Sequence, residues 1–392
     1  MKMNVLNKEK ILILTGNYGD GHNQVAQALH DAIQIRYPSL QPVIFDFMEC
    51  VHPYSKQFSR FIYLHGVKKF PQLYGYIYQK TRRANKLSNA MKAILSTGVG
   101  RMLKLIEQVQ PTVVVSTFPL AAAVISKLKS YGLIDIPTVT SITDHTDHSC
   151  WIYPFTDQYV VGSNLVRDSL INLGVEDTRI TETGIPIRQQ FSHSFNRERI
   201  FRKYGLDPQM PTLLIMGGGC GMIGEGNATI QGINSLKDPL QLIIVCGHNE
   251  KLRMELKEKL KDSKHRIHLT GYITYIHELM AISDLMITKP GGVTTFEAIA
   301  MELPMLLYKP IPGQEQDNAK FLVRSGVAVQ AESSQDFIEF LSNLMRDKKL
   351  LQQMRENTRQ FHPKESAFAS VEVIMNTKEA KNNWVDVKYM FG

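Results

Sequence analysis

Short apolar runs alternate with amphipathic, helix-like stretches along most of the chain. Six runs of strand length occur in the first half: ILILTG (11–16), PVIFDF (42–47), PTVVVSTF (111–118), IPTVTSIT (136–143), QYVVGS (158–163) and RITETGIPI (179–187). Strands separated by helical segments indicate a doubly wound parallel sheet with helices on its faces. We therefore predict a Rossmann-like domain for the first half.

A second series of the same kind follows a charged, helix-prone connector at 192–210. Its runs are TLLIMGGG (212–219), QLIIVCG (241–247), HRIHLTGY (265–272), LMITKPGG (285–292) and PMLLYKP (304–310). A chain of 392 residues suits two domains of roughly 150–200 residues each. We predict an α/β protein of two facing Rossmann-like domains with a cleft between them: an N-terminal domain over 1–190, a C-terminal domain over 191–365 and a helical tail over 366–392.

The segment 288–319 combines a strand end, a glycine turn, a helix, a buried strand and a polar loop. Ligands of open α/β sheets bind at the carboxyl ends of the strands, and helix N-termini attract phosphate. Gly291 and Gly292 are the predicted phosphate-binding turn. In the helix that follows, Glu297 is placed to accept hydrogen bonds from both hydroxyls of a ribose; the alternative is a solvated or capping carboxylate.

Beyond this helix, Gln314, Glu315 and Asn318 supply donors and acceptors suited to sugar hydroxyls, or form an Asx-type loop. A further glycine turn, Gly217, Gly218 and Gly219, follows the strand 212–216, where its backbone N–H groups suit phosphate. It lacks the Lys-Ser/Thr pair of a P-loop, so ATP hydrolysis is not predicted.

The N-terminal motif TGNYGDGH (15–22) places three glycines directly after the first strand. Its spacing differs from the GxGxxG of dinucleotide-binding proteins. Gly21 precedes His22, and we expect a helix from about Asn23. His22 is a candidate general base, because its ordinary pKa lies near physiological pH; a capping or core histidine is the alternative.

A second polar cluster, TDHTDHSCW (143–151), follows another predicted strand. Its histidines and aspartates allow a metal site, catalytic support or a hydrogen-bonded loop, since neighbouring residues in a loop fix no metal geometry by themselves. Asp144 and His148 are the candidate partners of His22, because both loops leave the same edge of the sheet. We expect no metal and no cofactor.

The charge of the chain, formally +8, is unevenly distributed. No acidic residue lies between Glu49 and Glu107, whereas basic and aromatic residues alternate there. The candidate surface residues are Phe58, Phe61, Lys68, Lys69, Tyr74, Tyr78, Arg82 and Arg83. Basic amphipathic segments with aromatics bind anionic membrane surfaces; a solvated helix pair or a nucleic-acid surface is the alternative.

The composition is that of a globular protein without a membrane-spanning segment. No run approaches the ~20 apolar residues of a spanning helix. A strand-like run begins at residue 11, so we expect no signal peptide. The four cysteines are scattered without a CxxC pair, as expected of reduced thiols in a cytosolic enzyme.

With these motifs assembled, the chain resembles the monogalactosyldiacylglycerol synthases and bacterial processive diacylglycerol glucosyltransferases. It is more distantly similar to the peptidoglycan glycosyltransferase that acts on lipid I. The matching segments are GNYGDGH, TDHTDHSCW, TGIPI (183–187), LTGY (269–272), KPGGVTTFE (289–297) and PIPGQEQDNA (310–319). They occur in the family's order over nearly the whole chain. The loop GGGCGMIG (217–224) departs from the family pattern through its cysteine and methionine.

The resemblance implies a GT-B fold, an inverting mechanism and transfer of a hexose, glucose in preference to galactose, from a UDP-sugar to diacylglycerol. It implies a diphosphate turn at Gly291, Gly292 and Thr294, a ribose carboxylate at Glu297, a sugar-binding group at Gln314, Glu315 and Asn318, and uracil recognition by the backbone around Tyr272 and Ile273. It implies that His22 is the base, supported by Asp144 and His148, and that segment 54–83 approaches lipid.

We therefore expect a metal-independent enzyme that binds UDP-sugar, diacylglycerol and anionic lipids but no nucleic acid. We expect it to be cytoplasmic and peripherally bound to the inner face of the cell membrane. Three alternatives stay open: a transferase for another lipid acceptor such as a polyprenyl-linked one, a UDP-sugar epimerase of related fold, and a non-catalytic nucleotide-sugar sensor.

Overall fold

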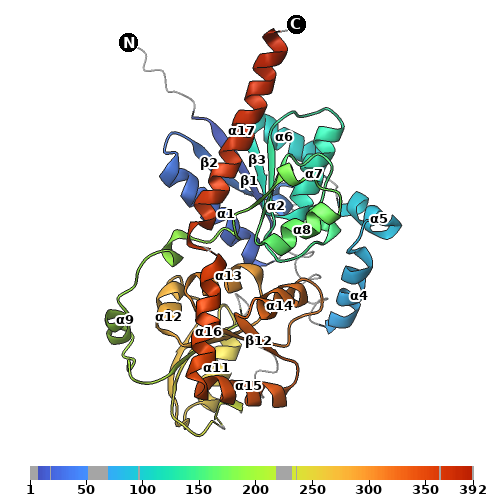
Figure 1. Cartoon of the computed structure of the whole chain (residues 1–392). Helices are drawn as coiled ribbons and strands as arrows, with labels where there is room; N and C mark the ends of the chain where they lie inside the picture. The colour runs from blue at the N-terminus through green and yellow to red at the C-terminus, as the bar shows by residue number, and fades with distance from the viewer. Residues whose placement is uncertain are drawn as a thin grey trace, which may run out of the picture. The chain divides into compact units, whose positions relative to one another are not determined.

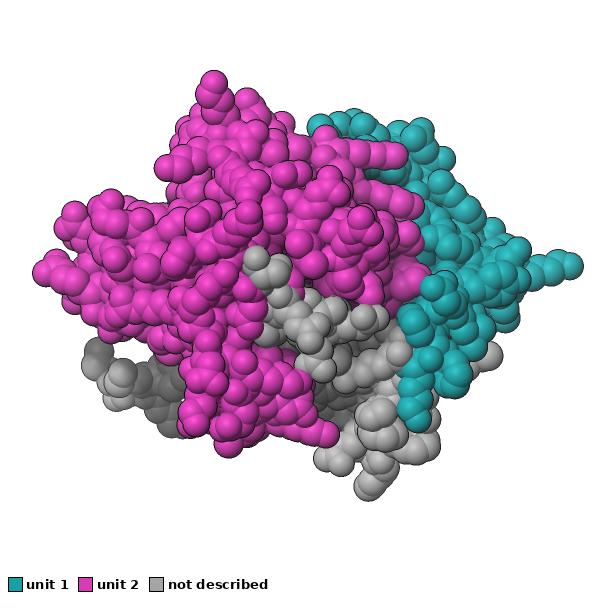
Figure 2. Space-filling model, turned by 90° about the horizontal axis from the view of Figure 1, so that it is seen from below, with its two compact units in different colours: residues 1–189, 365–392 teal, residues 190–364 magenta. Residues whose placement is uncertain are grey.

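The structure is a computed structural model that describes residues 8–17, 19–51, 69–95, 98–217, 232–234, 236–361 and 363–390. The chain forms two compact units, coloured separately in Figure 2. Unit 1 comprises residues 1–189 and 365–392, and unit 2 comprises residues 190–364.

Unit 1 is built on a parallel sheet of strand order β2-β1-β3-β4-β5-β6. Its strands are β1 (Lys10–Thr15), β2 (Gln41–Asp46), β3 (Pro111–Ser116), β4 (Thr138–Ser141), β5 (Gln158–Val161) and β6 (Ile180–Glu182). The stretch 11–14 of β1 is fully buried, as expected of a central parallel strand covered on both faces. The order reverses between β1 and β3, so the loops after these two strands diverge over opposite faces of the sheet.

Helices connect the strands of unit 1, and the C-terminal helix of the chain joins them (Figure 1). They are α1 (Asp20–Arg36), α2 (Phe47–Val51), α4 (Pro71–Thr81), α5 (Lys86–Leu95), α6 (Val99–Val109), α7 (Pro119–Ser130), α8 (Asn164–Asn172) and α17 (Ser366–Met390). Most are amphipathic; α6, for example, buries Met102, Leu105, Ile106 and Val109 along one face. In Figure 1, α4 and α5 stand out from the side of unit 1.

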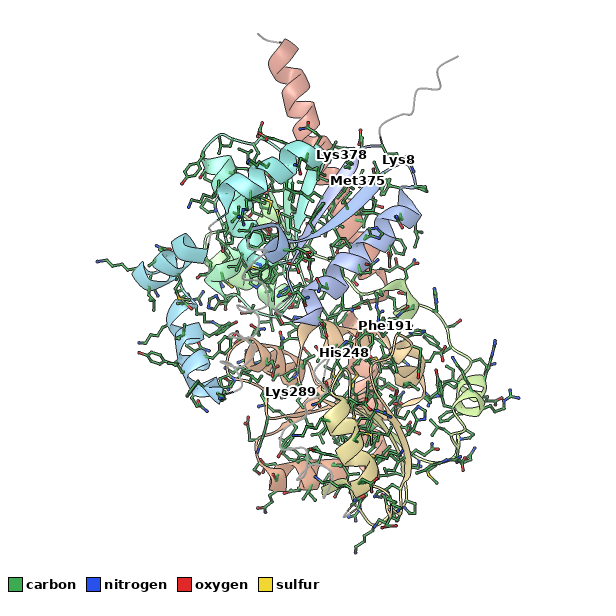
Figure 3. All side chains as sticks on the ribbon, turned by 180° about the vertical axis from the view of Figure 1, so that it is seen from behind. Lys8, Phe191, His248, Lys289, Met375 and Lys378 are labelled. Carbon is green, nitrogen blue, oxygen red and sulfur yellow. The ribbon has the colours of Figure 1, made fainter. Side chains whose placement is uncertain are left out.

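The C-terminal tail packs on unit 1, although it follows unit 2 in the sequence. The carboxylate of Glu372 in α17 binds Arg36 at 3.2 Å and accepts a hydrogen bond from Tyr37 at 3.1 Å. Lys378, labelled in Figure 3, pairs with Glu9. The predicted helical tail over 366–392 corresponds to α17, which runs from Ser366 to Met390.

Unit 2 repeats the architecture, with a parallel sheet of order β12-β11-β10-β7-β8-β9. Its strands are β7 (Thr212–Met216), β8 (Gln241–Val245), β9 (Arg266–Thr270), β10 (Leu285–Thr288), β11 (Met305–Tyr308) and β12 (Ala328–Ala331). Its helices are α9 (Arg197–Lys203), α11 (Glu250–Lys259), α12 (Ile276–Ile282), α13 (Gly292–Ala300), α14 (Gln314–Arg324), α15 (Ser334–Arg346) and α16 (Lys348–Thr358). The two doubly wound sheets confirm the predicted α/β class, although β12 was not among the predicted strands.

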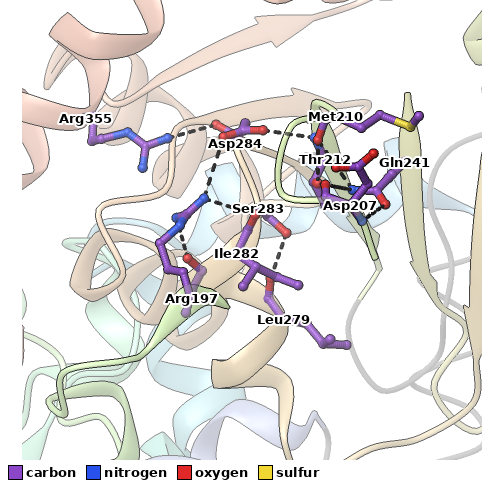
Figure 4. Close-up of polar contacts among 11 residues, drawn as sticks. Arg197, Asp207, Met210, Thr212, Gln241, Leu279, Ile282, Ser283, Asp284 and Arg355 are labelled. Carbon is purple, nitrogen blue, oxygen red and sulfur yellow. Dashed lines mark hydrogen bonds and ion pairs between the residues drawn. The ribbon is translucent and has the colours of Figure 1, made fainter. Parts of the chain in front are cut away.

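A polar network ties the amino ends of β7 and β10 together (Figure 4). The carboxylate of Asp284, just before β10, accepts a hydrogen bond from the backbone of Thr212 at 2.9 Å. Arg197 in α9 donates to the carbonyl of Ile282 and lies 4.0 Å from Asp284. Arg355 in α16 donates to the carbonyl of Asp284. These contacts hold α9 and α16 at the amino ends of β7 and β10. The polar loops that follow the strands lie at the other end of the sheet, beyond the carboxyl ends of the strands.

Candidate active site

In unit 1, the candidate base lies at the point where the strand order reverses. His22 follows β1, and Thr117 directly follows β3. Ligands of doubly wound sheets bind at such a switch point, beyond the carboxyl ends of the two strands. The helix α1 begins at Asp20 and not near Asn23 as predicted, so His22 lies inside its first turn.

The hydrogen bonds of His22 define its protonation. Its Nδ1 lies 2.7 Å from the carbonyl oxygen of Thr117. A carbonyl oxygen only accepts, so Nδ1 carries the proton, and the lone pair of the neutral ring is on Nε2. The hydroxyl of Thr143 lies 3.2 Å from the same Nδ1 and donates to the carboxylate of Asp144 at 3.3 Å. The sequence predicted Asp144 here but missed Thr117 and Thr143.

Burial lowers the pKa of His22, while the carboxylate of Asp144 and the carbonyl of Thr117 act in the opposite direction. The ring is flanked by Phe118, at a centroid distance of 5.2 Å, and by Trp151 at 6.0 Å. An apolar setting favours the neutral imidazole, which is the form that accepts a proton. This arrangement suits a general base.

Gly16 and Gly19, which lie before His22, differ in whether their surroundings leave space for a side chain. A Cβ on Gly16 would lie 2.6 Å from the ring of Phe118, so packing alone requires a glycine there. A Cβ on Gly19 would meet none of the described atoms within 4 Å, and its φ of −167° is open to any residue. Gly21, next to His22, is partly buried.

His148 is buried, and both of its ring nitrogens are engaged. Nδ1 accepts from the backbone N–H of Cys150 at 3.1 Å. Nε2 therefore carries the proton and donates to the carbonyl of Tyr78 in α4 at 3.0 Å. These bonds give His148 a positioning role in its own loop, and its predicted catalytic role stays a prediction.

The basic aromatic segment is described in part. Tyr78 is buried and Tyr74 is half-buried, whereas Lys69 is exposed. Arg82 and Arg83 pair with Asp147 at 2.6 and 3.3 Å. Phe58, Phe61 and Lys68 lie outside the described residues.

In unit 2, the strand order reverses between β7 and β10, and both strands lead into glycine turns. Gly217 ends the described part of the first turn; Gly218 and Gly219 lie outside it. In the second turn, Gly291 caps α13 with a φ of −73°, and a Cβ there would meet none of the described atoms within 4 Å. Neither backbone conformation nor local packing therefore requires a glycine at this position, as expected if a ligand needs the space.

The helix α13 carries three of the predicted donor-binding residues. Gly292 is its first residue, and Thr294 is partly exposed in its first turn. Glu297 lies in the second turn and is only 6% exposed. Its carboxylate is therefore largely shielded from water, and its predicted contact with ribose hydroxyls stays a prediction.

Gln314, Glu315 and Asn318 lie on the helix α14 and not in a loop as predicted. The sequence PIPG before them ends at Gly313, whose φ of 117° turns the chain into the helix. The carboxylate of Glu315 accepts from the backbone of Ile311 at 2.8 Å. The amide of Asn318 donates to the carbonyl of Pro290 at 2.9 Å. Asn318 thereby ties α14 to the second glycine turn, and its contact with a sugar stays a prediction.

A stacked ring pair lies beyond the carboxyl ends of β8 and β9. Tyr272 is 51% exposed and stacks on His248, with ring centroids 4.3 Å apart and an interplanar angle of 11°. Ile273 is partly buried beside it. Figure 3 labels His248 and also Lys289, which follows β10. The sequence drew no attention to His248.

In the described part of the chain, no group of three or more His, Cys, Asp or Glu side chains is placed to hold a metal ion. Within the same residues, no helix has the length and hydropathy of a membrane span.

Comparisons with known proteins cover both units. The model of the monogalactosyldiacylglycerol synthase family matches residues 22–187, and that of glycosyl transferases group 1 matches residues 229–361. The chain is 34% identical over 385 residues to a processive diacylglycerol beta-glucosyltransferase of Bacillus cytotoxicus, covering 98% of each chain. It is 32% identical to that of Bacillus pumilus, covering 96% of this chain and 97% of the relative.

The chain belongs to the family of processive diacylglycerol beta-glucosyltransferases. The resemblance drawn from the sequence motifs is thereby confirmed. The matches to these relatives cover 96% and 98% of the chain, so the relationship includes both units.

The fold of this diacylglycerol glucosyltransferase family member is similar to that of solved structures. MurG of Acinetobacter baumannii superposes with a TM-score of 0.61 at 15% identity, covering 94% of this chain and 99% of that one. MnaA of S. aureus, solved with UDP, has a TM-score of 0.61 at 15% identity, covering 93% and 95%. These likenesses confirm the GT-B fold.

Proposed function

We propose that this protein is an inverting glycosyltransferase that moves glucose from a UDP-sugar to diacylglycerol at a membrane surface. Full-length relatedness to diacylglycerol beta-glucosyltransferases carries this proposal. The switch-point histidine, with its proton on Nδ1 and its lone pair on Nε2, gives the reaction a base. A UDP-sugar as donor is in keeping with the neighbours of the same fold that were solved with UDP or UDP-glucose.

The reaction consists of one proton transfer and one substitution at the anomeric carbon. The primary hydroxyl oxygen of diacylglycerol attacks the anomeric carbon of glucose, and its proton passes to Nε2 of His22. The bond between the anomeric carbon and the diphosphate oxygen breaks, and UDP leaves with the electron pair. Attack opposite the leaving group inverts the α-linked donor to a β-product, in keeping with the names of the relatives.

Negative charge grows on the departing diphosphate, so catalysis needs positive potential there. We assign this role to the N–H groups at the start of α13, beside Gly291 and Gly292, and to the dipole of that helix. Glu297 accepts hydrogen bonds from the ribose, and Gln314, Glu315 and Asn318 contact the sugar. The backbone at Tyr272 and Ile273 recognises uracil. This arrangement needs no metal.

We extend the proposal to binding at an anionic membrane, through the exposed side chains of α4 and of the two residues before it. Phe70, Leu73 and Ile77 are 61%, 56% and 38% exposed, and Lys69 and Lys80 flank them. No acidic residue lies in the described stretch 69–95. Apolar side chains beside lysines suit the boundary of an anionic bilayer, where each lysine contributes about 1 kcal/mol.

We further propose that the enzyme works at the inner, cytoplasmic face of the cell membrane. The cysteines at 50, 150 and 246 are free thiols, which supports a reducing compartment.

A donor panel tests the proposed function. The purified protein is incubated with diacylglycerol in anionic vesicles and, in separate reactions, with UDP-glucose, UDP-galactose or UDP-N-acetylglucosamine. The lipids are then resolved by mass. We expect hexosyl-diacylglycerol from UDP-glucose. Binding of UDP-sugars without a lipid product from any donor would contradict the proposal and favour another acceptor or a sensor.

A further inference from the structure

The helix α4 is joined to the loop that contacts His22. The hydroxyl of Tyr78 in α4 lies 2.7 Å from the hydroxyl of Thr146, and its ring lies against that of His148 with centroids 4.3 Å apart. His148 donates in turn to the backbone carbonyl of Tyr78. Thr146 and His148 of the loop are therefore both held by Tyr78 of the helix.

The end of α4 adds further bonds to the same loop. Ser149 donates from its backbone N–H to the carbonyl of Arg82 at 2.9 Å, and from its hydroxyl to the carbonyl of Thr81 at 2.8 Å. The carboxylate of Asp147 pairs with Arg82 at 2.6 Å. Each of the loop residues 146–149 thus bonds to α4 or to the arginines that follow it.

The partners of His22 belong to this loop. Thr143 and Asp144 lie three and two residues before Thr146. The side chains that join loop and helix are buried: Thr146 is 3% exposed, Asp147 8% and His148 6%. Buried polar networks are costly to break, because each separated group loses its partner without gaining water. We therefore expect α4 and the loop to move as one body.

The opposite face of α4 is the one with the exposed apolar side chains. Leu73, Ile77 and Lys80 follow helical spacing on that face, whereas Tyr78 and Thr81 lie on the docked face. One short helix therefore carries the proposed membrane contact on one side and the bonds to the catalytic loop on the other. A membrane contact that orients the exposed face of α4 therefore also orients the face that bonds to the catalytic loop.

We propose that α4 couples membrane binding to catalysis: contact of its exposed face with the bilayer positions the loop 143–149, through Tyr78 and Asp147, against His22. Tyr78 and Asp147 are positioning residues in this account, and turnover is faster on a membrane surface than in solution. This inference rests on the proposed function, since it concerns the same reaction.

The test measures kcat with a short-chain, water-soluble diacylglycerol at saturating concentration, with and without anionic vesicles that contain no acceptor. Saturation removes the effect of the vesicles on acceptor concentration. For the wild type, we expect the vesicles to raise kcat about two- to tenfold, the range that one hydrogen bond supplies.

Three variants separate coupling from binding. Tyr78→Phe removes the hydroxyl that bonds Thr146 but keeps the ring on His148, and Asp147→Asn removes the charge that pairs with Arg82. Both should bind vesicles as the wild type does, and both should lose most of the rise in kcat. Tyr131→Phe makes the same change at a tyrosine that is 60% exposed after α7, and it should keep the full rise.

A second readout is independent of turnover. Hydrogen exchange of the Ser149 amide, which bonds Arg82, should slow when vesicles bind the wild type, and should slow less in Tyr78→Phe. Equal kcat with and without vesicles, or a rise in both loop variants as large as in the wild type, would overturn the coupling. Absence of any lipid product in the wild type would instead refute the proposed function, and the exchange measurement would still decide the coupling.

Discussion

Nδ1 of His22 lies 2.7 Å from the carbonyl oxygen of Thr117, a residue 95 positions further along the chain. These residues follow the two strands between which the order of the unit 1 sheet reverses. Because the carbonyl accepts a hydrogen bond from Nδ1, the neutral ring carries its proton on Nδ1 and its lone pair on Nε2. Topology therefore sets the chemistry of this histidine.

The pH dependence of the reaction should follow the lowered pKa of His22. Burial lowers this pKa, so the neutral base persists below the ordinary value of 6.5. We expect kcat/KM to stay level as the pH falls through 6.5 and then to decline with the slope of one proton.

In Asp144→Asn the carboxylate that raises this pKa is lost. The acidic decline should therefore move to still lower pH. A pH profile of the variant that moves to higher pH, or that coincides with the wild type, would contradict the electrostatic role of Asp144.

Glu297 should determine affinity for the nucleotide. In Glu297→Gln the charged acceptor for ribose hydroxyls is lost, and such bonds are worth about 1.5–3 kcal/mol. We expect UDP to bind about 10- to 100-fold more weakly, measured by calorimetry. The control is Glu302→Gln, just after α13, which removes a carboxylate that pairs with Arg359 on the surface. If the two variants lost UDP affinity equally, Glu297 would have no special role.

Gly291 should be needed for ligand binding and not for folding. A Cβ there meets none of the described atoms, and its φ is ordinary. Gly291→Ala should therefore change the free energy of unfolding by less than about 1 kcal/mol, yet weaken UDP binding. Gly16→Ala is the opposite case, because its Cβ would overlap the ring of Phe118, and it should lower stability. Chemical denaturation and UDP titration of both variants check this contrast; unchanged UDP affinity in Gly291→Ala would rule out close approach of the diphosphate.

His145 should make unit 1 sensitive to acid. Burial lowers its pKa to about 3, so below pH 6.5 the unfolded chain takes up a proton that the folded chain refuses. Stability from this group is complete above pH 6.5 and declines as the pH falls toward 3, by about 1.4 kcal/mol per pH unit. Urea unfolding of His145→Gln between pH 7 and 4 should show a shallower decline than the wild type; identical slopes would contradict the assignment.

The sequence predicted most strands of this fold, because parallel strands buried on both faces form continuous apolar runs, as in 11–14 and 212–216. It missed β12, since AVQA is short, contains a glutamine and lies at the edge of the sheet. It also predicted a loop at Gln314 and Asn318, where polar residues after a proline and glycine in fact begin the helix α14. Local polarity did not distinguish a loop from the exposed start of a helix.

The candidate site was predictable only as separate segments. His22 and Asp144 stood out because polar residues followed apolar strands. Thr117 and Thr143 did not, because their role depends on contacts that span 95 and 121 residues. Likewise, the bonds that hold His148 to Tyr78 span 70 residues. Such contacts are set by tertiary structure, and no local pattern reports them.

The most direct test of the account compares the lipid made from UDP-glucose and vesicle-bound diacylglycerol by the wild type and by His22→Ala. We predict glucosyl-diacylglycerol from the wild type and a rate about 10²- to 10⁴-fold lower in the variant, with unchanged affinity for UDP-glucose. No glucosylated lipid from the wild type, or a variant that turns over at the wild-type rate, would contradict it.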